Sequence, residues 1–342
     1  MEALWFALCA LVAALYVAFD GFDLGAGALH RFVAKSDGER RQVLSAIGPF
    51  WDGNEVWLLV FGGTLFLAFP QVLAVGLSGF YLAIFLVAWT LIGRGLSIEL
   101  RSHLGDPMWR GFWDTAFVLT SALTPVLFGA ALGNLLRGVP IDEDGWFALS
   151  FFESFSPTGE LGLLDWYTVL AGVFALAAVA HHGALFLAWK TDGAVRERSV
   201  RWAAGLLPAL VALWLAATIA TNVIAPGVFE GLRARPLAWM TSVVAFGGLA
   251  LSVFARRSGA DRTAFLGSFA FLLGMLAATA ASVYPTMIRG LPDDAGSLTA
   301  HNAAASGGAL TAALWWWPVG AALVAVYYTV LFRYHRGRRT AD

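Results

Sequence analysis

Long apolar stretches follow one another along almost the whole chain, and short polar segments separate them. Each stretch holds roughly 20 residues or more, which is the length that an α-helix needs to cross a lipid bilayer. The pattern predicts nine membrane-spanning helices and therefore an all-α, polytopic helical bundle. The predicted helices cover roughly residues 3–31, 51–70, 74–98, 113–136, 164–189, 203–223, 237–255, 264–288 and 309–333.

Composition supports a membrane protein. Of the 342 residues, 59% are hydrophobic and only 13% are charged, whereas soluble domains carry about 25% charged residues. No polar segment is large enough for a soluble domain, so we expect residues 1–342 to form a single integral membrane domain. The net charge of −1 argues against a nucleic-acid partner. Cys9 is the only cysteine, which excludes an internal disulfide. Residues 1–3 lack the positive region of a cleaved signal peptide, so we expect the first stretch to be retained.

Positive charges are distributed unevenly between the loops. Of the 22 Lys and Arg residues, Arg94 lies inside a predicted helix and only four lie in even-numbered loops. The other 17 lie in the odd-numbered loops and the C-terminal tail: Arg31, Lys35, Arg40, Arg41, Arg101, Arg110, Lys190, Arg196, Arg198, Arg201, Arg256, Arg257, Arg262, Arg333, Arg336, Arg338 and Arg339. Cytoplasmic loops of membrane proteins carry such an excess. We therefore expect the N-terminus outside and the C-terminus in the cytoplasm.

Charged residues interrupt the apolar pattern of three predicted helices. Asp20 and Asp23 lie three residues apart in the first helix, on one face. Asp20 lies about 25 Å from the outer end of that helix, near the predicted cytoplasmic side. The second helix begins on that side with Asp52 and Glu55, and Arg94 lies near the end of the inward-running third helix. Topology alone therefore predicts that four acids and one arginine converge at one depth.

Charged groups inside a membrane persist when they are paired, hydrated or protonated. Arg94 can neutralise one or two carboxylates, so the remaining acids are expected to hold and pass on protons. We hypothesise that Asp20, Asp23, Asp52 and Glu55 border a proton-uptake route from the cytoplasm. The structural alternative is that Asp52 caps the second helix, that Glu55 faces the headgroups, and that Asp20 or Asp23 simply pairs with Arg94.

Histidines offer little support for a haem or metal site in this chain. The six are His30, His103, His181, His182, His301 and His335. Only the adjacent pair in the fifth predicted helix is clearly intramembrane, and neighbouring side chains point about 100° apart on a helix. One helix cannot supply both axial ligands of a haem. We expect His181 and His182 to pack or form hydrogen bonds between helices.

Several motifs together resemble subunit II of the cytochrome bd-type ubiquinol oxidases. They lie mostly within residues 1–140 and comprise residues 20–27 (DGFDLGAG), 47–58 (IGPFWDGNEVWL), 62–66 (GGTLF), Arg94, Trp113-Asp114 and residues 133–140 (GNLLRGVP). The second half is looser, with Tyr284-Pro285 and residues 297–303 resembling a late motif of the family. Ala304, Ala305, Gly307 and Gly308 stand there where the family pattern has more hydroxyl residues.

The resemblance implies a haem-free subunit with nine helices in the inner membrane of a bacterium, paired with a similarly folded subunit I. Subunit I is implied to hold b- and d-type haems, oxidise quinol and reduce oxygen to water. Subunit II is implied to stabilise that assembly and to line a cytoplasmic proton path through Asp20, Asp23 and Asp52, with Arg94 as their partner. A small single-helix subunit, lipids and a bound quinone are further implied partners, with Trp51 as a quinone or lipid contact.

Two other functions fit the residues. A proton-coupled secondary transporter would also use acids and an arginine within a helical bundle. Transporters favour binding sites near the membrane midplane, formed by broken helices. The acids here lie toward one face and the central helices read as continuous, which disfavours a transporter. The third possibility is a purely structural scaffold.

Overall fold

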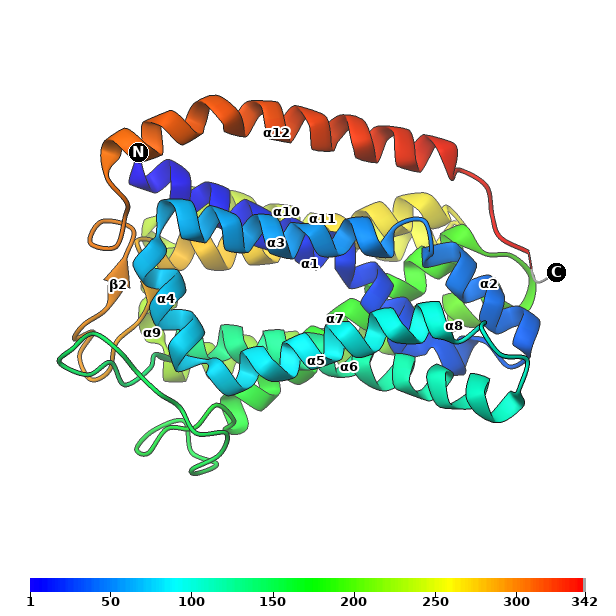
Figure 1. Cartoon of the computed structure of the whole chain (residues 1–342), viewed down its shortest axis with the longest axis horizontal. Helices are drawn as coiled ribbons and strands as arrows, with labels where there is room; N and C mark the ends of the chain where they lie inside the picture. Colours follow the sequence, from blue (N-terminus) through cyan, green and yellow to red (C-terminus); the bar gives the residue numbers. More distant parts are fainter. Residues whose placement is uncertain (341–342) are drawn as a thin grey trace.

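The structure, a computed structural model, describes residues 1–340, which form twelve α-helices and two short strands. Most helices run along the long axis of the molecule (Figure 1). Eight of them are long and apolar enough to cross a membrane, which confirms the polytopic helical bundle. They are α1 (Glu2–Val33), α5 (Tyr81–Leu100), α6 (Pro107–Arg137), α7 (Trp166–Lys190), α8 (Gly193–Ile224), α10 (Pro236–Arg257), α11 (Asp261–Val283) and α12 (Gly307–Tyr334).

The helix α3 (Trp51–Ala68) occupies the place of the second predicted span and runs beside α1 (Figure 1). Its 18 residues begin with a polar turn, so it is not among the eight. A total of nine spans therefore stays a prediction. The remaining elements lie at the two ends of the bundle: α2 (Asp37–Ile47) at one end, and α4 (Pro70–Gly79), α9 (Pro226–Ala234) and the antiparallel strands β1 (Thr286–Ile288) and β2 (Leu298–Thr299) at the other.

Some predicted boundaries were wrong. The third predicted helix, 74–98, is two helices, because α4 ends at Gly79 and α5 begins at Tyr81. A Cβ atom on Gly79 would lie 2.1 Å from the ring of Phe147, so this glycine lets the loop before α7 pack against the turn. The sixth predicted helix starts ten residues early, at Gly193, because its charged first turns extend beyond the apolar stretch. The eighth ends at Val283 rather than 288, before Pro285.

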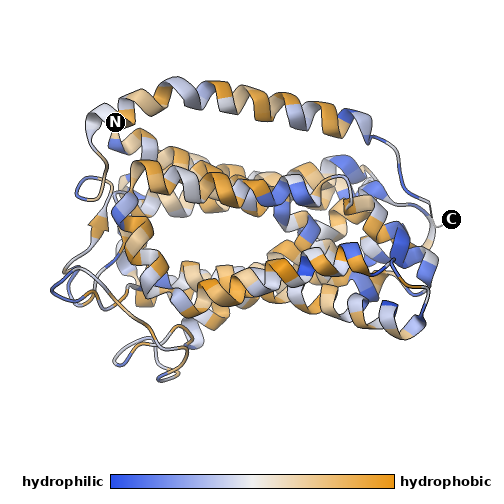
Figure 2. Ribbon diagram, in the orientation of Figure 1, coloured by the Kyte–Doolittle hydropathy of each residue, from blue (hydrophilic) through white to orange (hydrophobic). Residues whose placement is uncertain are grey.

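The two ends of the bundle differ in polarity. Hydrophilic residues gather at the end that holds α2 and the C-terminus (Figure 2). The loops between α5 and α6, α7 and α8, and α10 and α11 lie at the same end (Figure 1). These are the loops in which the positive charges concentrate. The orientation in a membrane stays a prediction, and this end is called the predicted cytoplasmic end below.

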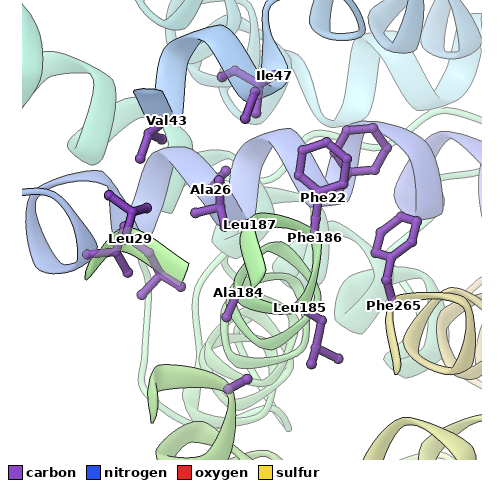
Figure 3. Packing of buried hydrophobic residues seen from close by; sticks show 14 of the residues in the cluster. Phe22, Ala26, Leu29, Val43, Ile47, Ala184, Leu185, Phe186, Leu187 and Phe265 are labelled. Carbon is purple, nitrogen blue, oxygen red and sulfur yellow. The ribbon is translucent and has the colours of Figure 1, made fainter. Parts of the chain in front are cut away.

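Helix α1 lies at the centre of the bundle and packs against α3, α6, α7 and α11. Every residue from Asp20 to His30 is buried. At this level Phe22 stacks on Phe186 of α7 with 4.1 Å between ring centroids, and Phe265 packs beside the pair (Figure 3). The ring of Phe50 also packs against both. The acids of α1 are thus set into a dense aromatic core, close to the predicted cytoplasmic end.

Candidate functional site

Arg94 of α5 joins two of the predicted acids. Its Nη1 donates a hydrogen bond to Asp20 Oδ1 of α1 at 2.7 Å, and its Nη2 donates to Glu55 Oε1 of α3. The side chains of Arg94 and Asp20 have no exposed surface, whereas that of Glu55 is 29% exposed. The predicted convergence of α1, α3 and α5 is therefore present. The group has a buried end at Asp20 and a partly open end at Glu55.

Asp23 lies one turn further along α1 and has a different partner. Its Oδ2 accepts a hydrogen bond from Asn54 Nδ2 at 2.6 Å. The Asn54 Oδ1 in turn accepts from the hydroxyl of Tyr328 in α12 at 3.0 Å, and Trp57 Nε1 donates to that hydroxyl at 2.8 Å. Asp23 is 1% exposed. In the sequence, Asn54 is part of the motif at residues 47–58, but its partner Tyr328 could not be predicted because it lies 274 residues further along the chain.

Two carboxylate oxygens of this group lack a hydrogen-bond partner among the described residues. They are Asp20 Oδ2 and Asp23 Oδ1, and both are buried. Buried polar atoms without a protein partner are unusual in native structures, so each of these two oxygens requires a specific explanation. Both atoms can accept a proton without breaking an existing bond.

The other two predicted residues lie at the start of α3. Asp52 is exposed at the predicted cytoplasmic end, and it makes no side-chain cap of α3. Trp51 is half-buried, and a Cβ on Gly95 of α5 would lie 3.6 Å from its ring. Asp52 therefore belongs to the surface beside the buried group rather than to the group itself. The role of Trp51 as a quinone or lipid contact stays a prediction.

Small residues bring neighbouring helices close to the acids. A Cβ on Gly25 would lie 2.0 Å from the carbonyl oxygen of Val179 and 2.9 Å from the Cα of Gly183. A Cβ on Gly27 would lie 2.1 Å from Ser121 Oγ of α6. Backbone contact between α1 and α7 therefore requires glycine at position 25 and fixes where the acids of α1 point.

A second charged group was missed by sequence reasoning. Asp114 of α6 has no exposed side-chain surface and accepts bonds from His30 Nε2 at 2.8 Å, Arg101 Nε at 2.6 Å and Arg40 Nη1 at 3.0 Å. Arg101 also donates to Asp37 at 2.8 Å. One buried carboxylate thus ties α1, α2 and the end of α5 to α6. The sequence signal for this group was Asp114, an acid in the first turn of a predicted span. Arginines lie on the same predicted side of the membrane, in the first and third loops.

Neighbouring charges keep Asp37 and Arg101 of this second group ionised. Burial disfavours charge on Asp37, but the Arg101 hydrogen bond and the nearby Arg101, Arg110 and Arg41 cations outweigh it and lower the pKa of this carboxyl. Burial likewise opposes charge on Arg101, yet its bonds to Asp114 and Asp37 raise the pKa of its guanidinium. Ions that stay charged over the physiological range serve as fixed anchors rather than as proton carriers.

The intramembrane histidines hold helices together, as predicted. His181 Nδ1 lies 3.0 Å from the carbonyl oxygen of Ala203 in α8. His182 contacts Ser268 Oγ of α11 through Nδ1 at 2.6 Å and the Ala18 carbonyl oxygen of α1 through Nε2 at 3.0 Å. Both ring nitrogens of His182 are therefore engaged. Within residues 1–340, no group of three or more His, Cys, Asp or Glu side chains is placed to hold a metal ion.

An apolar cavity of about 1050 Å³ lies toward the end of the bundle that holds α4 and α9, and residues of both helices line it. It lies between α1, α3, α4, α5, α6 and α11, and its walls include Phe61, Phe80 and Phe128. Glu230 of α9 and Arg235, which directly follows this helix, contribute polar groups. None of the four predicted acids lines it. The cavity suits a bulky apolar molecule and is separate from the charged group.

Comparison with known proteins agrees with the motifs. A family model described as cytochrome bd terminal oxidase subunit II matches residues 1–335. The cytochrome bd-I ubiquinol oxidase subunit 2 of Escherichia coli strain K12 is 36% identical over 221 residues, which are 63% of this chain and 57% of that protein. The cytochrome bd ubiquinol oxidase subunit 2 of Bacillus subtilis strain 168 is 34% identical over 203 residues, which are 59% of this chain and 57% of that protein. The matched regions thus span little more than half the length of these relatives.

A solved structure shares the fold. A chain in the structure of the bd oxidase from Geobacillus thermodenitrificans superposes on this one with a TM-score of 0.70. The superposition covers 97% of each chain, and the sequences are 19% identical. The two chains therefore have the same arrangement of helices despite extensive divergence of sequence.

Proposed function

The chain belongs to the cytochrome bd terminal oxidase subunit II family, and we propose that it is the haem-free subunit of a quinol oxidase that reduces oxygen to water. In this proposal a partner subunit I carries b- and d-type haems, which supply the redox chemistry. This chain stabilises the partner and conducts protons from the cytoplasm. The related proteins named as ubiquinol oxidase subunits support quinol as the reductant.

The observation that carries the proton-conducting role is the buried pairing of Arg94 with Asp20. In the proposal a proton reaches the exposed Asp52 and then the partly exposed Glu55. Arg94 links Glu55 to the fully buried Asp20. Asp23 lies one turn further along the same helix. Side-chain exposure decreases from Asp52 through Glu55 to Asp20, so the proposed route leads from the surface into the bundle.

Charge balance explains why these residues can hold a proton. Three acids, Asp20, Asp23 and Glu55, share the single cation of Arg94 in surroundings with little water. Surplus negative charge is costly there, so it is reduced by taking up a proton. The free oxygens Asp20 Oδ2 and Asp23 Oδ1 are available for it. Arg94 stays charged and orients the carboxylates, because guanidinium groups do not lose their proton in proteins.

A partner subunit is supported by the exposed face around α12. Only Leu310 of this 28-residue helix is buried. Trp315 and Trp316 are 79% and 77% exposed, and Leu59 of the adjacent α3 is 75% exposed. In the proposal subunit I covers this face, and a small single-helix subunit and lipids complete the assembly. The apolar cavity is the proposed place for a bound quinone or lipid tail.

Co-purification tests this function directly. The tagged chain would be isolated from bacterial membranes in mild detergent, and the absorption spectrum of the product recorded. The proposal expects a second polypeptide and the bands of b- and d-type haems. A colourless chain that binds a small substrate would favour a proton-coupled transporter, and a colourless chain without substrate would favour a scaffold.

A further inference from the structure

Arginines line a second hollow, at the predicted cytoplasmic end and far along the chain from the acids of α1. This hollow of about 430 Å³ lies between the start of α8 and the end of α10. Its lining includes four arginines, Arg196, Arg201, Arg256 and Arg257, and two acids, Glu197 and Asp261. Both helix ends lie at the same end of the molecule as the C-terminus (Figure 1).

Most of this positive charge is not neutralised within the chain. Asp261 is 5% exposed at its side chain, and its Oδ2 is already shared by Arg196 at 2.8 Å and Arg338 at 3.0 Å. Arg201, Arg256 and Arg257 have no ion pair among residues 1–340. The Nε of Arg256 is buried and has no hydrogen-bond partner there. Arginine presents planar, forked donors that match the oxygens of a phosphate group.

The backbone adds a weaker attraction for an anion. Helix α11 begins at this hollow, and no side chain caps its first turn. The unpaired N–H groups and the dipole at the start of a helix favour negative charge. Gly259, with a φ of +75°, makes the tight turn from α10 to α11 and lines the hollow. The arginines and the start of α11 thus favour an anionic group at one place, although the carboxylate of Asp261 already lies in the first turn of this helix.

Apolar surface continues from the arginines toward the centre of the membrane. Phe254 lies one turn back along α10 from Arg257 and is 67% exposed, and Leu251 is 45% exposed. Further along these two helices, the rings of Trp214 of α8 and Phe246 of α10 lie 4.9 Å apart. A molecule seated here would have its charged end among the arginines and its apolar part along α10.

We propose that the hollow between α8 and α10 binds the phosphate group of an anionic phospholipid from the cytoplasmic leaflet. Basic pockets between membrane helices on the cytoplasmic side are suited to anionic headgroups. The exposed Phe254 and Leu251 distinguish a lipid from a free phosphate ion, because a free ion gains nothing from them. This site is independent of the proposed proton route.

Native mass spectrometry of the intact complex tests the proposal. The complex would be titrated with phosphatidylglycerol, with zwitterionic phosphatidylcholine, and with phosphatidylglycerol in the presence of inorganic phosphate. The double variant Arg256→Gln/Arg257→Gln is expected to bind phosphatidylglycerol about tenfold more weakly, since each basic residue near the surface adds to the attraction. The charge-preserving variant Arg256→Lys/Arg257→Lys keeps the charge but loses the forked donors, so it is expected to bind phosphatidylglycerol more strongly than the Gln variant and more weakly than the native complex. It also shows that substitution here permits folding.

The matched control removes two cations from another part of the same end. Lys35→Gln/Arg41→Gln affects residues outside the hollow, both exposed. The proposal expects this control to bind phosphatidylglycerol like the native complex. Equal weakening in both double variants would show diffuse surface attraction and overturn it. Equal binding of phosphatidylcholine, or displacement of phosphatidylglycerol by millimolar inorganic phosphate, would also overturn it.

Discussion

Arg94 and Asp20 form an ion pair at 2.7 Å in which neither side chain has any exposed surface. Two charges removed from water in this way are costly unless they stay paired. The pair also lies beside Glu55, whose side chain keeps 29% of its surface exposed. Arg94 thus links the fully buried Asp20 to the partly exposed Glu55. This link is the basis of the proton-conducting role proposed for the chain.

Removing Arg94 is expected to destabilise the chain more than removing Glu55. Arg94→Gln leaves Asp20 buried without its cation, a change that costs about 3–5 kcal/mol for a buried pair. Glu55→Gln removes a partly hydrated acid and is expected to cost much less. Thermal unfolding of the purified complex measures both. A smaller loss in Arg94→Gln than in Glu55→Gln would contradict the assignment of Asp20 as the buried partner.

Because α1 packs closely on α7, a larger residue at position 25 is expected to destabilise the fold. Gly25→Ala would force a Cβ to within 2.0 Å of the Val179 carbonyl oxygen. Such overpacking typically costs about 1–3 kcal/mol. Gly62→Ala is the matched control, since a Cβ at this helical position meets nothing within 4 Å. The unfolding temperature should fall only in Gly25→Ala, and equal effects of the two substitutions would refute the close contact.

The Asp114 group is expected to be a structural anchor. Asp114→Asn would leave Arg101 and Arg40 facing a neutral amide in a buried site, so the unfolding temperature should fall strongly, with a loss of about 3–5 kcal/mol. Asp106→Asn is a suitable control, because Asp106 caps the same helix and Asn caps equally well. If the two variants unfold at the same temperature, Asp114 does not hold this end together.

The stability of the fold should depend on pH through Asp37. Burial acts to raise its pKa, but the arginines around it lower the pKa below the ordinary value of 3.8. Its carboxylate therefore stabilises the fold above about pH 3.8, and this contribution is lost as the pH falls through the lower folded-state pKa. The difference in unfolding temperature between the native chain and Asp37→Asn should shrink from pH 7 to pH 3. A difference that stays constant over this range would contradict the prediction.

The sequence predicted the fold well because lipid constrains it strongly. Helices that cross a bilayer must satisfy their own backbone hydrogen bonds, so apolar length alone reveals them. The helix boundaries that were predicted wrongly are set by features other than the length of the apolar stretch. The turn at Gly79 depends on Phe147, which lies in a distant loop, and the start of α8 depends on charged residues that continue the helix beyond the membrane.

The candidate site was predicted in part. Alternating topology was enough to bring Asp20, Glu55 and Arg94 to one depth, since each depth follows from position along its helix. Partners that depend on rotation about the helix axis, or on elements far apart in the sequence, were not accessible. The hydrogen bonds between Tyr328 and Asn54 and between His30 and Asp114 are of this kind. The exposure of Asp52 likewise follows from how α3 is rotated.

Proton uptake by the assembled complex tests the central claim most directly. The complex would be reconstituted in vesicles, and uptake from the predicted cytoplasmic side would be followed with a pH indicator after a pulse of oxygen. In Asp23→Asn the rate should fall about a hundredfold, at the lower end of what a proton-transferring group contributes. Asp52→Asn should also slow uptake, while Asp144→Asn, in the loop at the opposite end, should leave it unchanged. Native rates in both Asp23→Asn and Asp52→Asn, in complexes with their full haem content, would contradict the account.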